Sequence, residues 1–546
     1  MRKSLSLVVV LFLAGCTNLP TGGPVQFGGP LDAPTETQVQ YLASGPVEGA
    51  TQQEILEGYL AAGAAAQDNY RIAKLFLTDD FAAEWSPLQE AVIRGGETTV
   101  SSTGSTSLTY STAVTARVTR GGFYSLEEGG ASQTFEFGFE QVDGEWRISR
   151  APDAVFITAA TFDSVYQPFT VYFYNQSRSQ FVPDVRYFAR AGDPVTEVAR
   201  AVIAGPSEFL PNAATAFPST VTLVASPIEI VEGRALVDVS REILDASADE
   251  QQAMLTQMTT TLDAISGISA VSLTVDRSLL NVSGGRIPTA VADPQVSENA
   301  LIVRDGELGF SVGGNVEPLG RLGDRIMALN PTSISYHDTG VAAVGTTRGV
   351  YFVGDSQIQV SERPSTVEPQ IDGGNSVWWV SPTDSSTIRV FAGGRSTSVT
   401  APWGSAVVVR ALEISREDAR LAVAVDTPSG PRLYVASIGR DANGRMTSVT
   451  GYHRLPLSGS RVVDIAWADS TNIAVITKRN ASSVVELASV GGVTVAMGQP
   501  AKAATVAGGN GKSELVIRTE DGVLWQPRAG GWQSLGLTAS LLATQH

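Results

Sequence analysis

The segment IEIVEGRALVDVS, residues 228–240, decides the fold of the middle of this 546-residue chain. Apolar and polar residues alternate on both sides of Glu232-Gly233, and glycine readily adopts the positive φ that a tight turn needs. Two short alternating runs around such a turn predict a β-hairpin. We expect its strands over 228–231 and 235–240.

The sequence around this hairpin predicts a mixed α/β domain over residues 166–290. Apolar residues recur at helical spacing in two segments, each followed by a glycine, Gly205 or Gly267. Alternating runs elsewhere in the domain are typical of strands. The predicted elements are strands over 169–174, 181–188 and 271–276, and helices over 194–204 and 249–265.

Several ordered motifs of this domain resemble the GerMN domain of spore germination and sporulation proteins. They are Ala204-Gly205-Pro206, the pattern Ala-x-Val-Asp-x-Ser at 235–240, the Met- and Leu-rich second helix and the closing strand. The resemblance implies a GerMN-like α/β domain with no settled enzymatic role. Asp238 and Ser240 have no His or Lys nearby in the sequence to act as a base. We therefore expect them on the outer face of a strand or in a cap.

The N-terminus has the order of a bacterial lipoprotein signal. Arg2 and Lys3 precede an apolar run over 5–13, which is shorter than the roughly 20 residues of a membrane-spanning helix. Leu13-Ala14-Gly15-Cys16 then resembles a lipobox, whose Cys thiol takes a diacylglyceryl group. We expect a signal peptide over 1–15, a lipid on Cys16, and a chain held at the extracytoplasmic face of the cell membrane. With this single Cys lipidated, no disulfide or Cys-metal site remains.

The next part of the chain predicts a tether and then a first folded unit. Prolines and glycines crowd residues 16–50, which favours an extended lipidated tether. Residues 51–165 begin with helical spacing and end with alternating runs, an α+β order. This layout resembles the cystatin-like fold of a curved sheet over helices. The predicted elements are a helical segment over 53–77, which Gly58 and Gly63 weaken so that it divides into two helices, a short helix carrying Trp85, and strands over 107–119, 133–142 and 145–149.

The last part, residues 298–546, predicts an all-β domain. Pairs of glycines separate short alternating runs that recur at about 40–50 residues, the period of a four-stranded propeller blade. The span holds five or six such blades, and a pair of β-sandwiches is the alternative. Trp378 and Trp379 lie in one run, where at most one of two neighbours on a strand can face outward.

The whole order of parts resembles the LpqB family of actinobacterial lipoproteins. That order is lipobox, tether, α+β domain, GerMN-like domain and C-terminal β-propeller. The resemblance implies association with the MtrA–MtrB two-component system. In that system the lipoprotein would bind the extracytoplasmic part of the sensor histidine kinase and influence cell-envelope and division genes.

Composition and motifs exclude several other classes of function. A net charge of −17 disfavours nucleic-acid binding, which needs dense basic patches. His337, His453 and His546 are scattered, and no metal-binding motif or serine-hydrolase motif occurs. We therefore expect no cofactor, no metal and no enzymatic activity. One alternative stays open, an envelope glycan-binding protein or enzyme that uses the propeller face, because folding can bring distant carboxylates together.

Overall fold

The computed structural model describes residues 43–127, 132–401, 403, 407–480, 482–528 and 531–546. In the first domain, threonine side chains accept backbone N–H groups at the starts of three helices. Thr51 caps α2 (Gln52–Ala62), Thr78 caps α4 (Asp79–Glu84) and Thr158 caps α5 (Ala159–Val165). A separate helix, α3 (Gln67–Lys74), follows the C-cap Gly63, so the predicted division into two helices is confirmed.

The sheet of this domain has the order β5-β4-β2-β1-β6, with β3 paired to β2. The predicted strands are confirmed within a residue, but β1 was not predicted. Its pairing with β2 shifts register after Ile93 and again after Gly95, which breaks the alternation that marks a strand. The bounds are β1 (Glu90–Gly104), β2 (Ser107–Thr119), β3 (Tyr124–Leu126), β4 (Ser132–Val142), β5 (Glu145–Arg150) and β6 (Val155–Thr158).

The middle domain confirms the predicted hairpin and both predicted helices. Its small sheet has the order β12-β11-β10-β9, with β10 and β11 parallel and the other pairs antiparallel. The strands β7 and β8 form a separate antiparallel ribbon. The bounds are β7 (Tyr166–Tyr174), β8 (Phe181–Ala189), α6 (Pro194–Ala204), β9 (Glu229–Val231), β10 (Arg234–Asp238), α7 (Ala248–Leu262), β11 (Ala270–Val275) and β12 (Ser278–Leu279).

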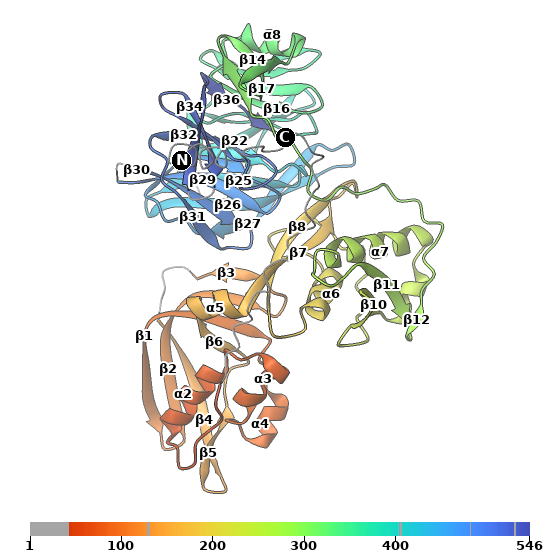
Figure 1. Ribbon diagram of the computed structural model, residues 1–546, viewed down its shortest axis with the longest axis vertical. Helices are drawn as coiled ribbons and strands as arrows, with labels where there is room; N and C mark the ends of the chain where they lie inside the picture. The colour runs from red at the N-terminus through yellow and green to blue at the C-terminus, as the bar shows by residue number, and fades with distance from the viewer. Residues whose placement is uncertain (1–42, 128–131, 402, 404–406, 481, 529–530) are drawn as a thin grey trace, which may run out of the picture. The chain divides into compact units, whose positions relative to one another are not determined.

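The described residues from 301 onward form six sheets, green to blue in Figure 1. The strand bounds are β13 (Leu301–Arg304), β14 (Glu307–Val312), β15 (Asn315–Pro318), β16 (Ser333–His337), β17 (Val341–Thr346), β18 (Gly349–Val353), β19 (Gln357–Ser361), β20 (Gln370–Ile371), β21 (Val377–Ser381), β22 (Asp384–Ala392), β23 (Arg395–Ser398), β24 (Val408–Ile414), β25 (Arg420–Thr427), β26 (Gly430–Arg440), β27 (Met446–Leu455), β28 (Arg461–Trp467), β29 (Asn472–Arg479), β30 (Ser482–Ser489), β31 (Thr494–Gly498), β32 (Ala503–Ala507), β33 (Val516–Thr519), β34 (Val523–Arg528), β35 (Gly531–Thr538), β36 (Leu541–Leu542) and β37 (Thr544–Gln545).

These six sheets form a closed, propeller-like ring. One strand of each sheet contacts its counterparts in the two neighbouring sheets, in the cyclic order β36, β16, β20, β24, β28 and β32. We call these six the inner strands. The strand β36 pairs with β13, and β37 runs parallel to β16, so residues near 541–545 complete the first two sheets. Closure removes sheet edges that would otherwise be unpaired.

One expectation for this domain was wrong in detail. A helix, α8 (Arg321–Met327), interrupts the predicted all-β pattern. Trp378 and Trp379 are both buried, because both faces of β21 are covered within the ring. The indole Nε1 of Trp378 donates to Asp372 Oδ2 at 3.0 Å, and the burial of both rings agrees with the expectation that at most one of them faces outward.

Candidate functional site

A polar cavity lies in the centre of the ring, among the first residues of the inner strands. Its volume is about 270 Å³, and we call it the channel mouth. The other domains contact the loops that follow the inner strands, as described below, so the mouth opens at the opposite end of the ring. The lining residues are mostly polar: Thr332, Ser333, Ser365, Thr366, Glu368, Gln370, Arg410, Asp464 and Thr544, with Val367, Ala411, Leu412, Val463, Ile465 and Ala504.

Two carboxyl groups of the channel mouth have raised pKa values. Burial raises the pKa of Asp464 to about 7, although the backbone N–H of Val506 donates to its Oδ2 at 2.8 Å. Burial and the nearby Asp464 also raise the pKa of Glu368 well above its ordinary value. Arg410 pairs with Asp426 at 2.6 Å beside them. The mouth therefore presents proton-donating carboxyls beside a cation, which suits hydrogen bonding to a polar ligand.

The far end of the channel is filled by the chain itself. Arg440 pairs with Asp372 at 3.0 Å, and the ring of His546 lies 2.9 Å from Gln370 Oε1. Burial lowers the pKa of His546 to about 3, with a further lowering from the neighbouring His337. The fold thus brings together two histidines that are 209 positions apart in the sequence. Both rings are built into hydrogen bonds, which is a structural role.

A junction around β8 joins the ring to the other two domains, since the described residues belong to one compact unit. The side chain of Arg420 is fully buried there and pairs with Glu417 at 2.5 Å. It also donates to the carbonyls of Ser470 at 2.6 Å and Pro183 on β8 at 3.5 Å. Its guanidinium carbon lies 4.6 Å from the centre of the Trp467 ring, a cation–π contact.

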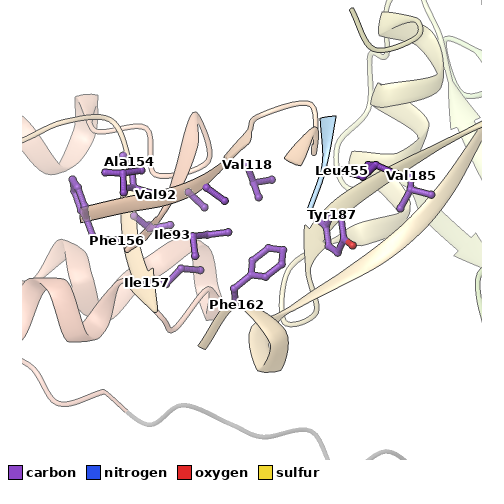
Figure 2. Close-up of a cluster of buried hydrophobic side chains, with 14 of the residues drawn as sticks. Val92, Ile93, Val118, Ala154, Phe156, Ile157, Phe162, Val185, Tyr187 and Leu455 are labelled. Carbon is purple, nitrogen blue, oxygen red and sulfur yellow. The ribbon is translucent and has the colours of Figure 1, made fainter. Parts of the chain in front are cut away.

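Aromatic side chains from all three domains meet at the same junction. Phe123 of the first domain stacks on Phe209 of the middle domain at 5.6 Å, and His453 of β27 lies 5.1 Å and 5.0 Å from those two rings. Burial lowers the pKa of His453 to about 4. Figure 2 shows the adjoining apolar cluster, which runs from Phe162 through Tyr187 to Leu455. The three domains therefore share one buried core.

The middle domain places its two candidate residues in structural roles. Asp238 is buried and accepts from Thr274 Oγ1 at 2.8 Å and from the backbone N–H of Arg277 at 2.9 Å. We expected Asp238 on the outer face of its strand, but it is buried because the parallel strand β11 and the turn that follows it supply these donors. Ser240 accepts from the backbone N–H of Thr222 at 3.1 Å. The Ser240 side chain also hydrogen-bonds to Glu242, which lowers the pKa of that exposed carboxyl.

The lipobox residues Leu13, Ala14 and Gly15 and the lipidation site Cys16 lie outside the described residues. The limits of signal peptide, tether and domains stay predictions. Within the described residues no group of His, Cys, Asp and Glu side chains is arranged to hold a metal ion. None of the helices in those residues is long and apolar enough to cross a membrane.

Sequence reasoning missed the polar residues of the channel mouth. Glu368, Arg410 and Asp464 come from three different sheets, so no local motif joins them. One signal was available: Asp464 interrupts the apolar run Val462-Val463-Asp464-Ile465-Ala466-Trp467. A charged residue inside a strand of otherwise buried type marks either an ion pair or a site.

Fold and domain order define a class of protein, a mostly-β lipoprotein that carries a GerMN domain and a propeller. Family models match in the same order: "Lipoprotein LpqB, N-terminal domain" over residues 45–163, "Sporulation and spore germination" over 170–280 and "Lipoprotein LpqB beta-propeller domain" over 306–540. The chain belongs to the LpqB family of lipoproteins. Such proteins are held at a membrane by their lipid.

Similar proteins match along the whole length. A lipoprotein LpqB of Cutibacterium acnes is 26% identical, with 98% of this chain and 99% of the relative covered. One of Streptomyces coelicolor is 23% identical, with 96% and 95% covered. Among solved structures, the first GerMN domain of GerM from Bacillus subtilis is 21% identical, with a TM-score of 0.19 and coverage of 22% of this chain and 92% of that one.

Proposed function

We propose that this chain is a non-catalytic accessory lipoprotein, anchored through a lipid on Cys16 to the outer face of the cell membrane. Its folded part binds the extracytoplasmic region of a sensor histidine kinase of the MtrB type and modulates signalling by that kinase. Through the kinase it influences the cell envelope and cell division. No nucleic acid and no cofactor take part.

The observation that carries this proposal is the agreement of the whole chain with LpqB lipoproteins, at 98% and 99% coverage in one relative. Agreement over every domain supports a shared role better than a match to one domain does, because each of these folds alone serves many functions. The family resemblance supplies the kinase as partner.

The geometry is consistent with regulation by binding. The polar residues at the far end of the channel and at the junction are paired within the ring, and Arg420 also donates to the carbonyl of Pro183 in the middle domain. A lipid anchor would confine this unit to the membrane surface and raise its effective concentration beside a membrane partner. A binding protein changes its partner's output only through different affinity for two states of that partner.

The test is binding of the mature chain, with Cys16→Ser to keep it soluble, to the purified kinase ectodomain. We expect saturable binding and, in a deletion strain, altered expression of the kinase's target genes. The Cys16→Ala protein should leave the membrane fraction and restore signalling poorly. No binding at high micromolar concentration, together with unchanged target genes in the deletion strain, would remove the kinase from the proposal.

One observation favours a second candidate, the binding of an envelope glycan. The channel mouth holds Glu368 and Asp464 with raised pKa values, which makes them hydrogen-bond donors to sugar hydroxyls near neutral pH. Titration with soluble peptidoglycan fragments tests this role. Binding that Asp464→Asn and Glu368→Gln both abolish supports the glycan, and its absence in the unsubstituted chain excludes it.

A further inference from the structure

The first domain contains a second cavity, of about 660 Å³, that the proposed function does not use. It lies between helix α2, the preceding segment 43–50 and the strands β1 and β6. The volume is in the range of small-molecule sites, which run from about 300 to 1,000 Å³. All residues that line this cavity belong to the described part of the chain.

The body of this cavity is apolar and its walls are fixed. The segment 43–50 is held across the sheet by Glu145, whose carboxylate accepts from the backbone N–H of Gly49 at 2.9 Å. Gly58 of α2 lets the ring of Phe76 approach, since a Cβ at Gly58 would lie 2.4 Å from that ring. Apolar lining residues include Ile55, Leu60, Ala61, Ala64, Phe76 and Phe156.

One end of the cavity is polar and cationic. Arg94 of β1 lies beside Thr158 of β6 in the parallel register, and both line the cavity with Thr161. The hydroxyls of Thr158 and Thr161 are 2.9 Å apart. Hydroxyls and a guanidinium together are donors for a carboxylate.

The side chain of Arg94 is half-buried and, unlike Arg186 and Arg117, lacks an ion-pair partner in the described part of the chain. Its Nε is buried with no hydrogen-bond acceptor, and within the described residues Arg94 forms no ion pair. Arg186, by contrast, pairs with Asp184 at 2.7 Å, and Arg117 pairs with Glu90 and Glu127. A buried cation is normally paired, because leaving it unpaired is costly.

The two acidic residues that line the cavity do not pair with Arg94. Glu48 is exposed at the rim. Glu54 turns its carboxylate to its own helix cap, where it accepts from the backbone N–H of Thr51 at 2.8 Å. Within the described residues no anion pairs with Arg94, so charge complementarity favours a ligand that joins an anionic group to an apolar body filling the rest of the cavity.

We propose that this cavity binds a long-chain fatty acid. The carboxylate pairs with Arg94 and accepts a hydrogen bond from whichever of the Thr158 and Thr161 hydroxyls does not donate to the other, and the acyl chain lies along α2 and the Phe76 and Phe156 rings. The driving force for the chain is removal of apolar surface from water. The carboxylate supplies the acceptor that Arg94 lacks.

The experiment measures binding of palmitate and of the neutral alcohol hexadecanol to the mature chain carrying Cys16→Ser, by competition with a fluorescent fatty acid. We expect palmitate to bind more tightly than the alcohol. Arg94→Gln should weaken palmitate about tenfold to a hundredfold and leave the alcohol unchanged. The matched control is Arg150→Gln on β5, whose side chain is 66% exposed, and it should change neither affinity.

A second variant tests the proposal even if circular dichroism shows that Arg94→Gln fails to fold. Ala64→Leu adds volume to the cavity wall and should weaken acid and alcohol alike. The proposal is overturned if the chain binds palmitate no more tightly than hexadecanol, or if Ala64→Leu changes neither affinity. It is also overturned if lysophosphatidylglycerol binds and palmitate does not, since the site would then belong to a phospholipid.

Discussion

The junction around β8 and the channel mouth both bury charged groups, but they do so in opposite ways. At the junction, Arg420 has a carboxylate, two carbonyls and an aromatic ring as partners. At the mouth, burial raises the pKa values of Asp464 and Glu368. The paired charges stabilise the ring where it contacts β8, whereas acids without a cationic partner carry a cost that a ligand can relieve. The charged groups at the junction therefore have a structural role, whereas those at the channel mouth are candidates for ligand binding.

Breaking the junction should give the largest effect. Arg420→Met leaves Glu417 buried without its cation, and we expect a loss of about 3–5 kcal/mol in the free energy of unfolding. Urea unfolding measures the loss. Arg410→Met at the mouth, where the Arg side chain is 33% exposed, serves as the comparison and should cost much less. Equal losses in the free energy of unfolding for the two variants would contradict this difference between the junction and the channel mouth.

The channel mouth should make the free energy of unfolding depend on pH. The folded Asp464 keeps its proton up to about pH 7, whereas the unfolded carboxyl loses it near 3.8, so unfolding releases a proton in this window and stability falls as pH rises. Asp464→Asn removes this titration. Between pH 4 and pH 7 the unsubstituted chain should lose about 3 kcal/mol relative to the variant. Asp338→Asn, at a side chain that is 77% exposed, is the control and should show no such trend.

The junction should respond to pH in the opposite direction and more weakly. His453 stays neutral in the fold down to about pH 4, whereas the unfolded ring takes a proton near 6.5, so acidification favours unfolding. His453→Phe keeps an aromatic ring and loses no hydrogen bond of Nε2, which has no partner. At pH 5 the variant should gain about 2 kcal/mol over the unsubstituted chain. An identical pH profile for the two proteins would contradict a buried neutral ring.

Local patterns predicted most of the elements. The hairpin at Glu232-Gly233, the helix that ends at Gly205 and the inner strands near Ile334, Leu412 and Ile465 depend on periodicity and turn chemistry within a few residues. Such signals survive without knowledge of the fold. The strand β1 was not predicted because its bulges shift the apolar face midway along the strand.

Local sequence patterns could not predict the candidate sites, for a different reason. The surroundings of Arg94 depend on its neighbour Thr158, which lies 64 positions later in the sequence. The surroundings of Asp464 depend on Glu368, which lies just before a strand of another sheet. A single charged residue in an apolar run does not reveal whether its partner is absent. Only the tertiary contacts show that Arg420 is satisfied and Arg94 is not.

The pairing of β36 with β13 and of β37 with β16 sets the order in which this protein can mature. Residues 301–304 cannot complete their sheet until residues 541–542 have been made, about 240 positions later. Until then the ring is open, and β13 and β16 each expose an unpaired edge to other chains. Synthesis of the last residues and closure of the ring are therefore linked steps. The interval between them is when this protein is most exposed to proteases and aggregation.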